Sequence, residues 1–218
     1  MSRIRVHNLA VSLDGFGAGE DPTLESPFGH AGMRLMEWFL ATPSFQRVHL
    51  GTEPEPTPAI EADDAFARRN LEGIGAHVMG SRMFGLPGWQ DDPEWRGWWG
   101  EEPPYGTPVY VLTHRPRPDL VLGRTTFHFV DAPAGEVARQ AREAAAGLDV
   151  QVSGGPTTVR EFLDADLVDT MHVVVVPIVL GRGSSLWAGQ EGLEERFDIR
   201  STTTPSGVTH HEFTRRGR

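Results

Sequence analysis

The stretch DVQVSGGPTTVREFL, residues 149–163, contains residue types that could hold an anion. Alternating valines predict a buried strand, and the apolar residues near its end recur at helical spacing. Two glycines between these elements let the backbone approach a ligand, and the free N–H groups of the helix start favour a phosphate. The residues that would form this site are Gly154, Gly155, Pro156, Thr157 and Thr158. The alternative is an ordinary tight turn, because the fuller motif G-x-G-x-x-G is absent.

Other polar residues carry weaker signals. Neighbouring side chains of a strand point to opposite faces, so only His210 and Glu212 of HHE share a face, and a structural or surface role is expected. His128 alternates with phenylalanines and is typical of a strand histidine. Ser184 and Ser185 in LGRGSSLW have no recognisable base partner. The LGRG segment instead predicts a turn near a substrate or cofactor.

Composition excludes several classes of protein and site. The 218 residues, 39% of them hydrophobic, predict one domain over 1–218 with a sizeable core. A net charge of −10 argues against general binding to nucleic acid or anionic membranes. The absence of cysteine excludes disulfides, thiolate catalysis and cysteine-ligated zinc, and no metal site is expected. No signal peptide or membrane span is recognisable, so we expect a cytoplasmic protein.

Strand and helix patterns alternate along the chain. We expect strands near 4–11, 76–80, 108–113, 126–130, 150–152, 170–181, 195–203 and 207–214. Helices are expected over 30–41, 62–71, 134–146 and after Gly155, the first burying Met33, Met36, Phe39 and Leu40. The order predicts an α/β fold with a mixed, mostly parallel sheet, helices on both faces and antiparallel C-terminal strands.

Two long loops interrupt this order. The Pro-rich and acidic segment 51–64 is expected to be the most mobile part. The segment 85–106 holds four of the six tryptophans, and it either covers a pocket or packs against another subunit. Asp91 and Asp92 of this segment are expected to be solvated loop acids, and so are Asp63 and Asp64.

Five segments in this order resemble one family. They are LAVSLDGF, VMGSRMFG, PVYVLTHRP, VSGGPTTVREFL and LVDTMHVVVVPIVLGRGSSLW. Together they resemble the dihydrofolate reductase-like fold, and most closely its branch related to the pyrimidine reductase of riboflavin biosynthesis. The resemblance spans nearly the whole chain. It implies a three-layer single domain, a homodimer, and NADPH bound at the carboxyl ends of the strands, where a doubly wound sheet binds ligands.

The resemblance also implies a set of cofactor-binding residues. The Gly-Gly turn would cradle the pyrophosphate, and Ser81 stands where the family usually has arginine, with Arg82 following it. Thr113, His114 and Arg115 stand at the position of the adenosine 2′-phosphate, which an arginine can grip by two oxygens. A solvated loop is the alternative for these three. The remaining positions implied for the cofactor are Ala10, Gly80 and Met83.

The resemblance places the chemistry on two acids. Asp14 would face the junction of nicotinamide and substrate, although it could instead close an Asx-type turn on Gly15. Glu37 lies on the helix that would line the substrate cleft. The pteridine-binding acid of dihydrofolate reductases corresponds to Leu35, and Glu37 lies about 200° around a helix from it, so dihydrofolate is a poor substrate. The positions implied for substrate binding are Phe16, Trp38, Pro177 and Gly181.

Two functions of different classes follow. The first is an NADPH-dependent reductase that reduces a small heterocyclic, imine or carbonyl substrate, with an acid or water supplying the proton. The second is a nucleotide-binding or regulatory protein of the same fold without the chemistry. The unassigned catalytic acid and the altered Gly-Ser-Arg turn keep the second open.

Overall fold

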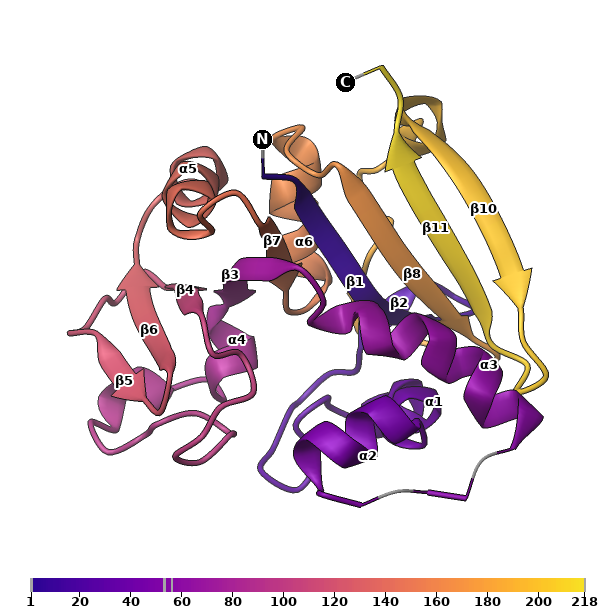
Figure 1. Ribbon diagram of the computed structural model, residues 1–218, viewed down its shortest axis with the longest axis horizontal. Coiled ribbons are helices and arrows are strands. Elements are labelled where there is room, and N and C mark those ends of the chain that lie inside the picture. The colour runs from indigo at the N-terminus through magenta and orange to yellow at the C-terminus, as the bar shows by residue number, and fades with distance from the viewer. Residues whose placement is uncertain (1, 53, 56, 218) are drawn as a thin grey trace. The chain divides into compact units, whose positions relative to one another are not determined.

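The computed structural model describes residues 2–52, 54–55 and 57–217, and these form two compact units (Figure 1). The first unit contains residues 2–6 and 73–169. The second contains the described residues of 7–72 and 170–217. Whether these units behave as one domain over 1–218 stays a prediction.

The first unit is a mostly parallel sheet. Its strands are β1 (Ile4–Ser12, of which Ile4–Val6 pair here), β7 (Asp149–Ser153), β3 (Ile74–Gly80), β4 (Pro108–Leu112), β6 (Thr125–Val130) and β5 (Leu120–Leu122), in that order. Every neighbouring pair is parallel except β5 and β6. Its helices are α4 (Ser81–Phe84), η3 (Trp89–Asp91), α5 (Ala134–Ala144) and α6 (Pro156–Asp164). Helices α5 and α6 contact β3, β7 and each other, so they cover one face.

The tryptophan-rich segment covers the other face of this sheet. Trp89 is buried there against Phe84, Phe127 and Phe129, and Trp95 and Trp99 pack on the same cluster. Of the four tryptophans between 85 and 106, only Trp98 is classed as exposed. The segment is therefore part of the unit's own core, and most of its indoles are not available to another subunit.

The second unit pairs its C-terminal strands antiparallel, as expected. Its sheet runs β10 (Phe197–Thr203), β11 (Thr209–Arg215), β8 (Thr170–Val176) and β1, and a small ribbon joins β2 (Phe16–Ala18) to β9 (Ser184–Ser185). Its helices are η1 (Gly32–Leu35), α1 (Glu37–Leu40), α2 (Pro43–His49), α3 (Pro58–Ala67), η2 (Arg68–Asn70) and η4 (Leu193–Arg196). No helix of the described residues is long and apolar enough to cross a membrane.

The single helix expected over 30–41 is wrong. The segment forms η1 and then α1, and the buried side chains are Leu35 and Trp38, whereas Met33 is 39% exposed. Leu35 lies in the 3₁₀ helix η1 and Trp38 in α1, three residues further on. Met33 and Met36 have the same spacing, so the expectation chose the wrong face of a segment with apolar residues on more than one face.

Three other boundaries differ from the expectation. The strand expected to reach residue 181 ends at Val176, because Pro177 has no N–H for the ladder. Helix α2 was not expected, although Thr42 caps it and Pro43 begins it, a usual helix-start pattern. Helix α3 begins inside the expected 51–64 loop, of which residues 53 and 56 lie outside the described part.

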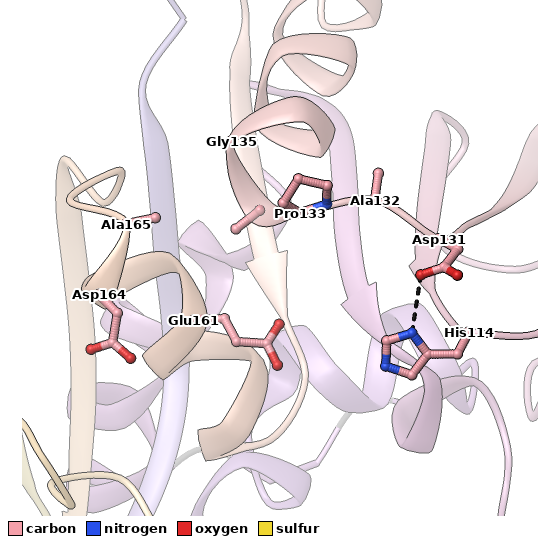
Figure 2. A pocket seen from close by; sticks show the side chains of 9 residues that line it. His114, Asp131, Ala132, Pro133, Gly135, Glu161, Asp164 and Ala165 are labelled. Carbon is pink, nitrogen blue, oxygen red and sulfur yellow. Dashed lines mark hydrogen bonds and ion pairs between the residues drawn. The ribbon is translucent and has the colours of Figure 1, made fainter.

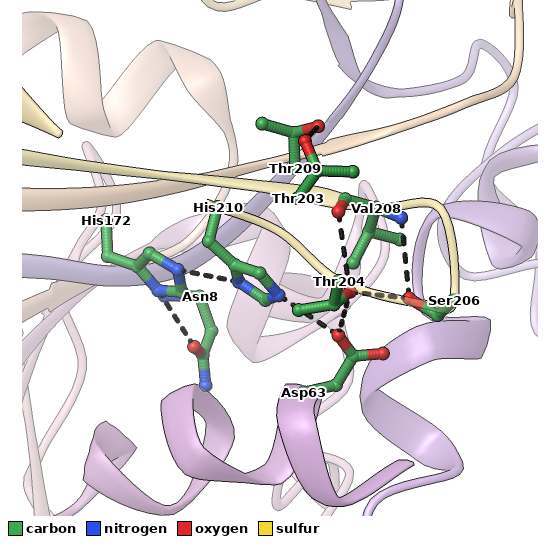
Figure 3. Close-up of polar contacts among 9 residues, drawn as sticks. All are labelled: Asn8, Asp63, His172, Thr203, Thr204, Ser206, Val208, Thr209 and His210. Carbon is green, nitrogen blue, oxygen red and sulfur yellow. Dashed lines mark hydrogen bonds and ion pairs between the residues drawn. The ribbon is translucent and has the colours of Figure 1, made fainter. Parts of the chain in front are cut away.

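A buried hydrogen-bonded chain joins α3 to the sheet of the second unit (Figure 3). Asp63 Oδ1 lies 3.1 Å from His210 Nε2, and His210 Nδ1 lies 3.0 Å from His172 Nε2. His172 Nδ1 then lies 3.1 Å from the side-chain oxygen of Asn8 on β1. Burial alone would raise the pKa of Asp63, but hydrogen bonds from His210 and Thr204 outweigh it and lower that pKa. Asp63 is thus a buried, ionised anchor and not the solvated acid expected, while His210 has the structural role expected of it.

Two buried histidines make the fold sensitive to mild acid. Burial, with a smaller effect of Arg5, lowers the pKa of His77 to about 3, and burial lowers the pKa of His172 well below its usual value. The unfolded chain takes up protons near pH 6.5 while these folded side chains do not. Their contribution to stability is therefore complete above about pH 6.5 and is lost as the pH falls toward the folded-state pKa.

Replacing His77 by leucine should flatten this dependence. At pH 5, proton uptake by an unfolded histidine whose folded pKa is about 3 costs the fold about 2 kcal/mol. The drop in unfolding free energy between pH 7.5 and pH 5, measured by urea denaturation, should be smaller by about that amount in His77→Leu. The control is His114→Gln, because the His114 side chain is 99% exposed. A His77→Leu drop equal to the parent's would contradict the neutral burial of His77.

Candidate functional site

Two helices of the first unit begin directly at the ends of neighbouring parallel strands. Gly80 ends β3 and is the N-cap of α4, and Gly155 follows β7 and is the N-cap of α6. Strands β3 and β7 pair in parallel up to Met79 and Ser153, so both helix starts lie at the same edge of the sheet. Neither N-cap makes a side-chain hydrogen bond to its helix. These first N–H groups are the donors that an anion would use.

The two turns touch at positions where a side chain would not fit. A Cβ on Gly80 would lie 2.2 Å from Thr158 Oγ1, and a Cβ on Gly154 would lie 3.2 Å from the Gly80 nitrogen. Gly154 also has φ +122°, which L side chains rarely adopt. The glycines therefore let α6 and the start of α4 approach each other.

The conformation of Gly155 does not require glycine. Its φ is −79°, which any residue adopts, and a Cβ there would meet nothing within 4 Å. The backbone angle that needs glycine belongs to Gly154. A side chain at residue 155 would enter the open space in front of α6, where Pro156 and Thr158 are buried and Thr157 is exposed.

The residues after Gly80 have separate roles. Ser81 Oγ accepts hydrogen bonds from Trp89 Nε1 at 3.0 Å and from Gln90 Nε2 at 3.1 Å. Met83 packs against the apolar cluster under the tryptophan-rich segment. Arg82 is exposed and makes no ion pair within the described part of the chain. It is the side chain of α4 that remains available to an anion.

The three residues expected at a 2′-phosphate already have partners. Thr113 is buried, and its Oγ1 accepts from the Arg115 backbone N–H at 3.2 Å and from Gln90 Nε2 at 3.4 Å. Arg115 pairs with Asp91, and this hydrogen bond lowers the pKa of that carboxyl. His114 Nδ1 lies 3.0 Å from Asp131 Oδ1.

An open groove of about 670 Å³ lies beside His114 (Figure 2). Its wall includes the start of α5 at Pro133 and Gly135 and the side of α6. The side chains that Figure 2 shows around it include three carboxylates, those of Asp131, Glu161 and Asp164. This acidic lining does not suit a phosphate, so the groove adds nothing to an anion site.

In the second unit, Asp14 is an ionised carboxylate that holds a turn. Its oxygens accept from the backbone N–H groups of Leu180 at 3.1 Å and Gly181 at 2.7 Å. A hydrogen bond from the Ser12 hydroxyl and these N–H groups lower the pKa of Asp14 to about 2. Asp14 therefore joins the end of β1 to the loop after β8 and has no proton to donate near neutral pH.

The other residues expected near a substrate divide between core and surface. Trp38 and Ala10 lie in one apolar cluster of the second unit, and Phe16 packs against it. The Ala10 side chain is thus a core group. The indole Nε1 of Trp38 is buried and has no hydrogen-bond partner among the described residues. Glu37, Pro177 and Gly181 are exposed.

Sequence reasoning missed the residues that complete these contacts. Gln90 and Asp91 contact Ser81, Thr113 and Arg115 from a 3₁₀ turn, and Asp131 pairs with His114. Asp91 was expected to be a solvated acid, and no spacing in the chain links it to Arg115. No cluster of three or more His, Asp or Glu residues suited to a metal occurs within the described ranges.

Comparisons with known proteins identify relatives of the fold. A family model described as the RibD C-terminal domain matches residues 5–210. A search of curated proteins finds no match. A protein from Shewanella sp. PV-4 that is described as belonging to riboflavin biosynthesis is 20% identical, with a TM-score of 0.59 over all of both chains.

Two further solved structures have the same fold at lower identity. A deaminase/5-amino-6-(5-phosphoribosylamino)uracil reductase from Thermotoga maritima is 14% identical, with a TM-score of 0.53 over 98% of this chain and 56% of that one. Dihydrofolate reductase from Enterococcus faecalis, complexed with NADP(H) and RAB-propyl, is 12% identical, with a TM-score of 0.51 over 99% and 97% of the two chains. The expected dihydrofolate reductase-like fold is confirmed.

Substitutions at the two adjacent glycines should separate fold from ligand binding. Gly155→Val places its side chain in open space and needs no unusual backbone angle, so its melting temperature should stay close to the parent's, while binding of NADPH, the cofactor that the resemblance implies, should be lost. Gly154→Val, the matched control, has φ +122° and should lose roughly 1–3 kcal/mol of stability. Thermal melting and NADPH titration of both variants provide the test. Normal NADPH affinity in a folded Gly155→Val variant would exclude a phosphate at the start of α6.

Proposed function

Because this chain belongs to the RibD C-terminal domain family, we propose that it is an NADPH-dependent reductase of a small heterocyclic substrate. The substrate class that the family favours is a pyrimidine with a reducible C=N or C=O group, as in 5-amino-6-(5-phosphoribosylamino)uracil. The observation that carries the proposal is the pair of uncapped helix starts at Gly80 and Gly155, which the parallel strands β3 and β7 bring to one sheet edge.

These helix starts fit the diphosphate of a dinucleotide. The N–H groups at the start of α6 supply donors and a partial positive charge. Arg82 adds a full positive charge at the start of α4, which compensates for the arginine that the family usually has one position earlier. Thr113, His114 and Arg115 would then meet the 2′-phosphate.

The resemblance assigns the substrate to residues of the second unit. When bound, NADPH supplies a hydride, and the protein has to hold the acceptor and provide a proton. Phe16 is half-buried against the apolar cluster that contains Trp38, so it offers an apolar surface for a planar ring. Asp14 would act as a charge that shapes the 180–181 turn. Glu37, exposed and without a partner in the described part of the chain, is the acid left to donate a proton, with water as the alternative.

One observation favours a nucleotide-binding protein without reductase activity as the second candidate. Asp14 is committed to two backbone N–H groups and has no proton to donate near neutral pH. A dihydrofolate reductase is not favoured, because Leu35, at the position of the pteridine-binding acid, is apolar and 1% exposed.

We also propose a homodimer, which the family resemblance implies, and the cytoplasmic location that the sequence analysis expects. Three of the four valines of β8 are buried, and Trp89, Trp95 and Trp99 of segment 85–106 pack into the core of their own unit. A dimer would therefore have to use exposed apolar residues such as Leu13, Val179 and Ile199.

Oxidation of NADPH, followed at its absorption band with pyrimidine, pterin and simple carbonyl compounds, tests the reaction. The reductase proposal expects turnover with a pyrimidine and none with dihydrofolate. Binding of NADPH without turnover of any of these compounds would support the second candidate.

Replacing Arg115 by alanine tests the choice of cofactor. Loss of a charged hydrogen bond should weaken NADPH by about tenfold to a hundredfold and change NADH little, since NADH has no 2′-phosphate. The dissociation constants of both cofactors, measured by fluorescence titration, show whether Arg115 distinguishes NADPH from NADH. Equal losses for NADPH and NADH would remove Arg115 from the 2′-phosphate site.

A further inference from the structure

One short turn contacts three of the residues assigned to the nucleotide. The side chains of η3 reach the ends of two neighbouring parallel strands, β3 and β4. The contacts are Trp89 and Gln90 with Ser81, Gln90 with Thr113, and Asp91 with Arg115. These three consecutive side chains occupy polar groups that a bound nucleotide would need.

From these contacts we infer that Asp91 is a specificity-determining residue for the cofactor. Its carboxylate holds Arg115 where a 2′-phosphate would bind, so NADPH has to displace Asp91 and NADH does not. The strength of the Asp91–Arg115 pair then sets the ratio of the two affinities. This inference rests on the proposed function, and it adds a competitor for Arg115 that the family resemblance does not contain.

Asp91 is held in place by a buried anchor. Trp89 is 5% exposed, packs on Phe84 and Phe129, and donates its indole N–H to Ser81. The Asp91 N–H donates to the Gly88 carbonyl at 2.9 Å, which closes the turn. The carboxylate is therefore presented to Arg115 by a fixed backbone and not by a mobile loop.

The pair is nevertheless weak enough to exchange. The Arg115 and Asp91 side chains are 59% and 67% exposed, and water screens an ion pair at such a position. A phosphate dianion has more charge than a carboxylate, and an arginine can grip two of its oxygens. A displaced Asp91 would remain beside the phosphate and repel it, because both groups are negative. Both effects oppose NADPH and leave NADH largely untouched.

The test is Asp91→Asn, which keeps the size of the side chain and removes its charge. The dissociation constants of NADPH and NADH are measured by fluorescence titration at low and high salt. NADPH should bind about threefold to tenfold more tightly in the variant, and NADH should change less than twofold. Screening should shrink the gain at high salt.

Two controls make the result specific. Asp92→Asn makes the same change in net charge one residue further on, where the carboxylate accepts the Glu94 N–H and does not pair with Arg115. It should leave the affinity ratio unchanged. In an Arg115→Ala background, Asp91→Asn should raise the ratio less than it does in the parent, because only the direct repulsion between Asp91 and the phosphate remains.

The outcomes separate this inference from the proposed function. An Asp91→Asn variant whose NADPH and NADH affinities change equally, or whose NADPH affinity falls, overturns the role of Asp91. The nucleotide site survives that result if Arg115→Ala still weakens NADPH selectively. Failure of the parent protein to bind either nucleotide overturns both.

Discussion

The absence of side chains at Gly80 and Gly154 is the constraint on which the first unit's site depends. Parallel pairing brings β3 and β7 side by side, and each strand ends in a helix start. Two such starts can lie at one edge only if the turns do not collide. A Cβ on Gly80 would lie 2.2 Å from Thr158 Oγ1, closer than any real contact. The same two glycines therefore permit the packing of the fold and leave a set of helix N–H groups facing open space.

Most of the elements could be predicted because their signals are local. The buried parallel strands are short apolar runs flanked by glycine or proline, and β7 with α6 follows directly from one turn. One error occurred where more than one apolar face was possible. Residues 30–41 have apolar side chains on more than one face, and packing into the second unit's core selected Leu35 and Trp38 as the buried ones. No local sequence pattern shows which of these side chains will be buried.

The backbone turns of the candidate site could be predicted from the sequence, but the partners of its side chains could not. Glycines and a proline at a strand end indicate a phosphate turn from sequence alone. Contacts between residues that are distant in the chain could not be predicted from local patterns. Asp14 accepts a hydrogen bond from Gly181, 167 positions away, and Asp91 pairs with Arg115, 24 positions away. Such contacts changed the interpretation of both residues. Asp14 is an ionised carboxylate that holds a turn, and Arg115 is half of an ion pair.

These partners divide the candidate nucleotide site into groups that are free and groups that are occupied. The helix N–H groups after Gly80 and Gly155, together with Arg82, have no competing side chain in the described ranges. Arg115 and His114 each face a carboxylate. Hydrogen-bond donors that have no protein partner contribute most to the binding free energy of a ligand, because no existing hydrogen bond has to be broken. Affinity for a dinucleotide should therefore come from its diphosphate at the helix starts. Discrimination between nucleotides should come from the exchange of a carboxylate for a phosphate at Arg115.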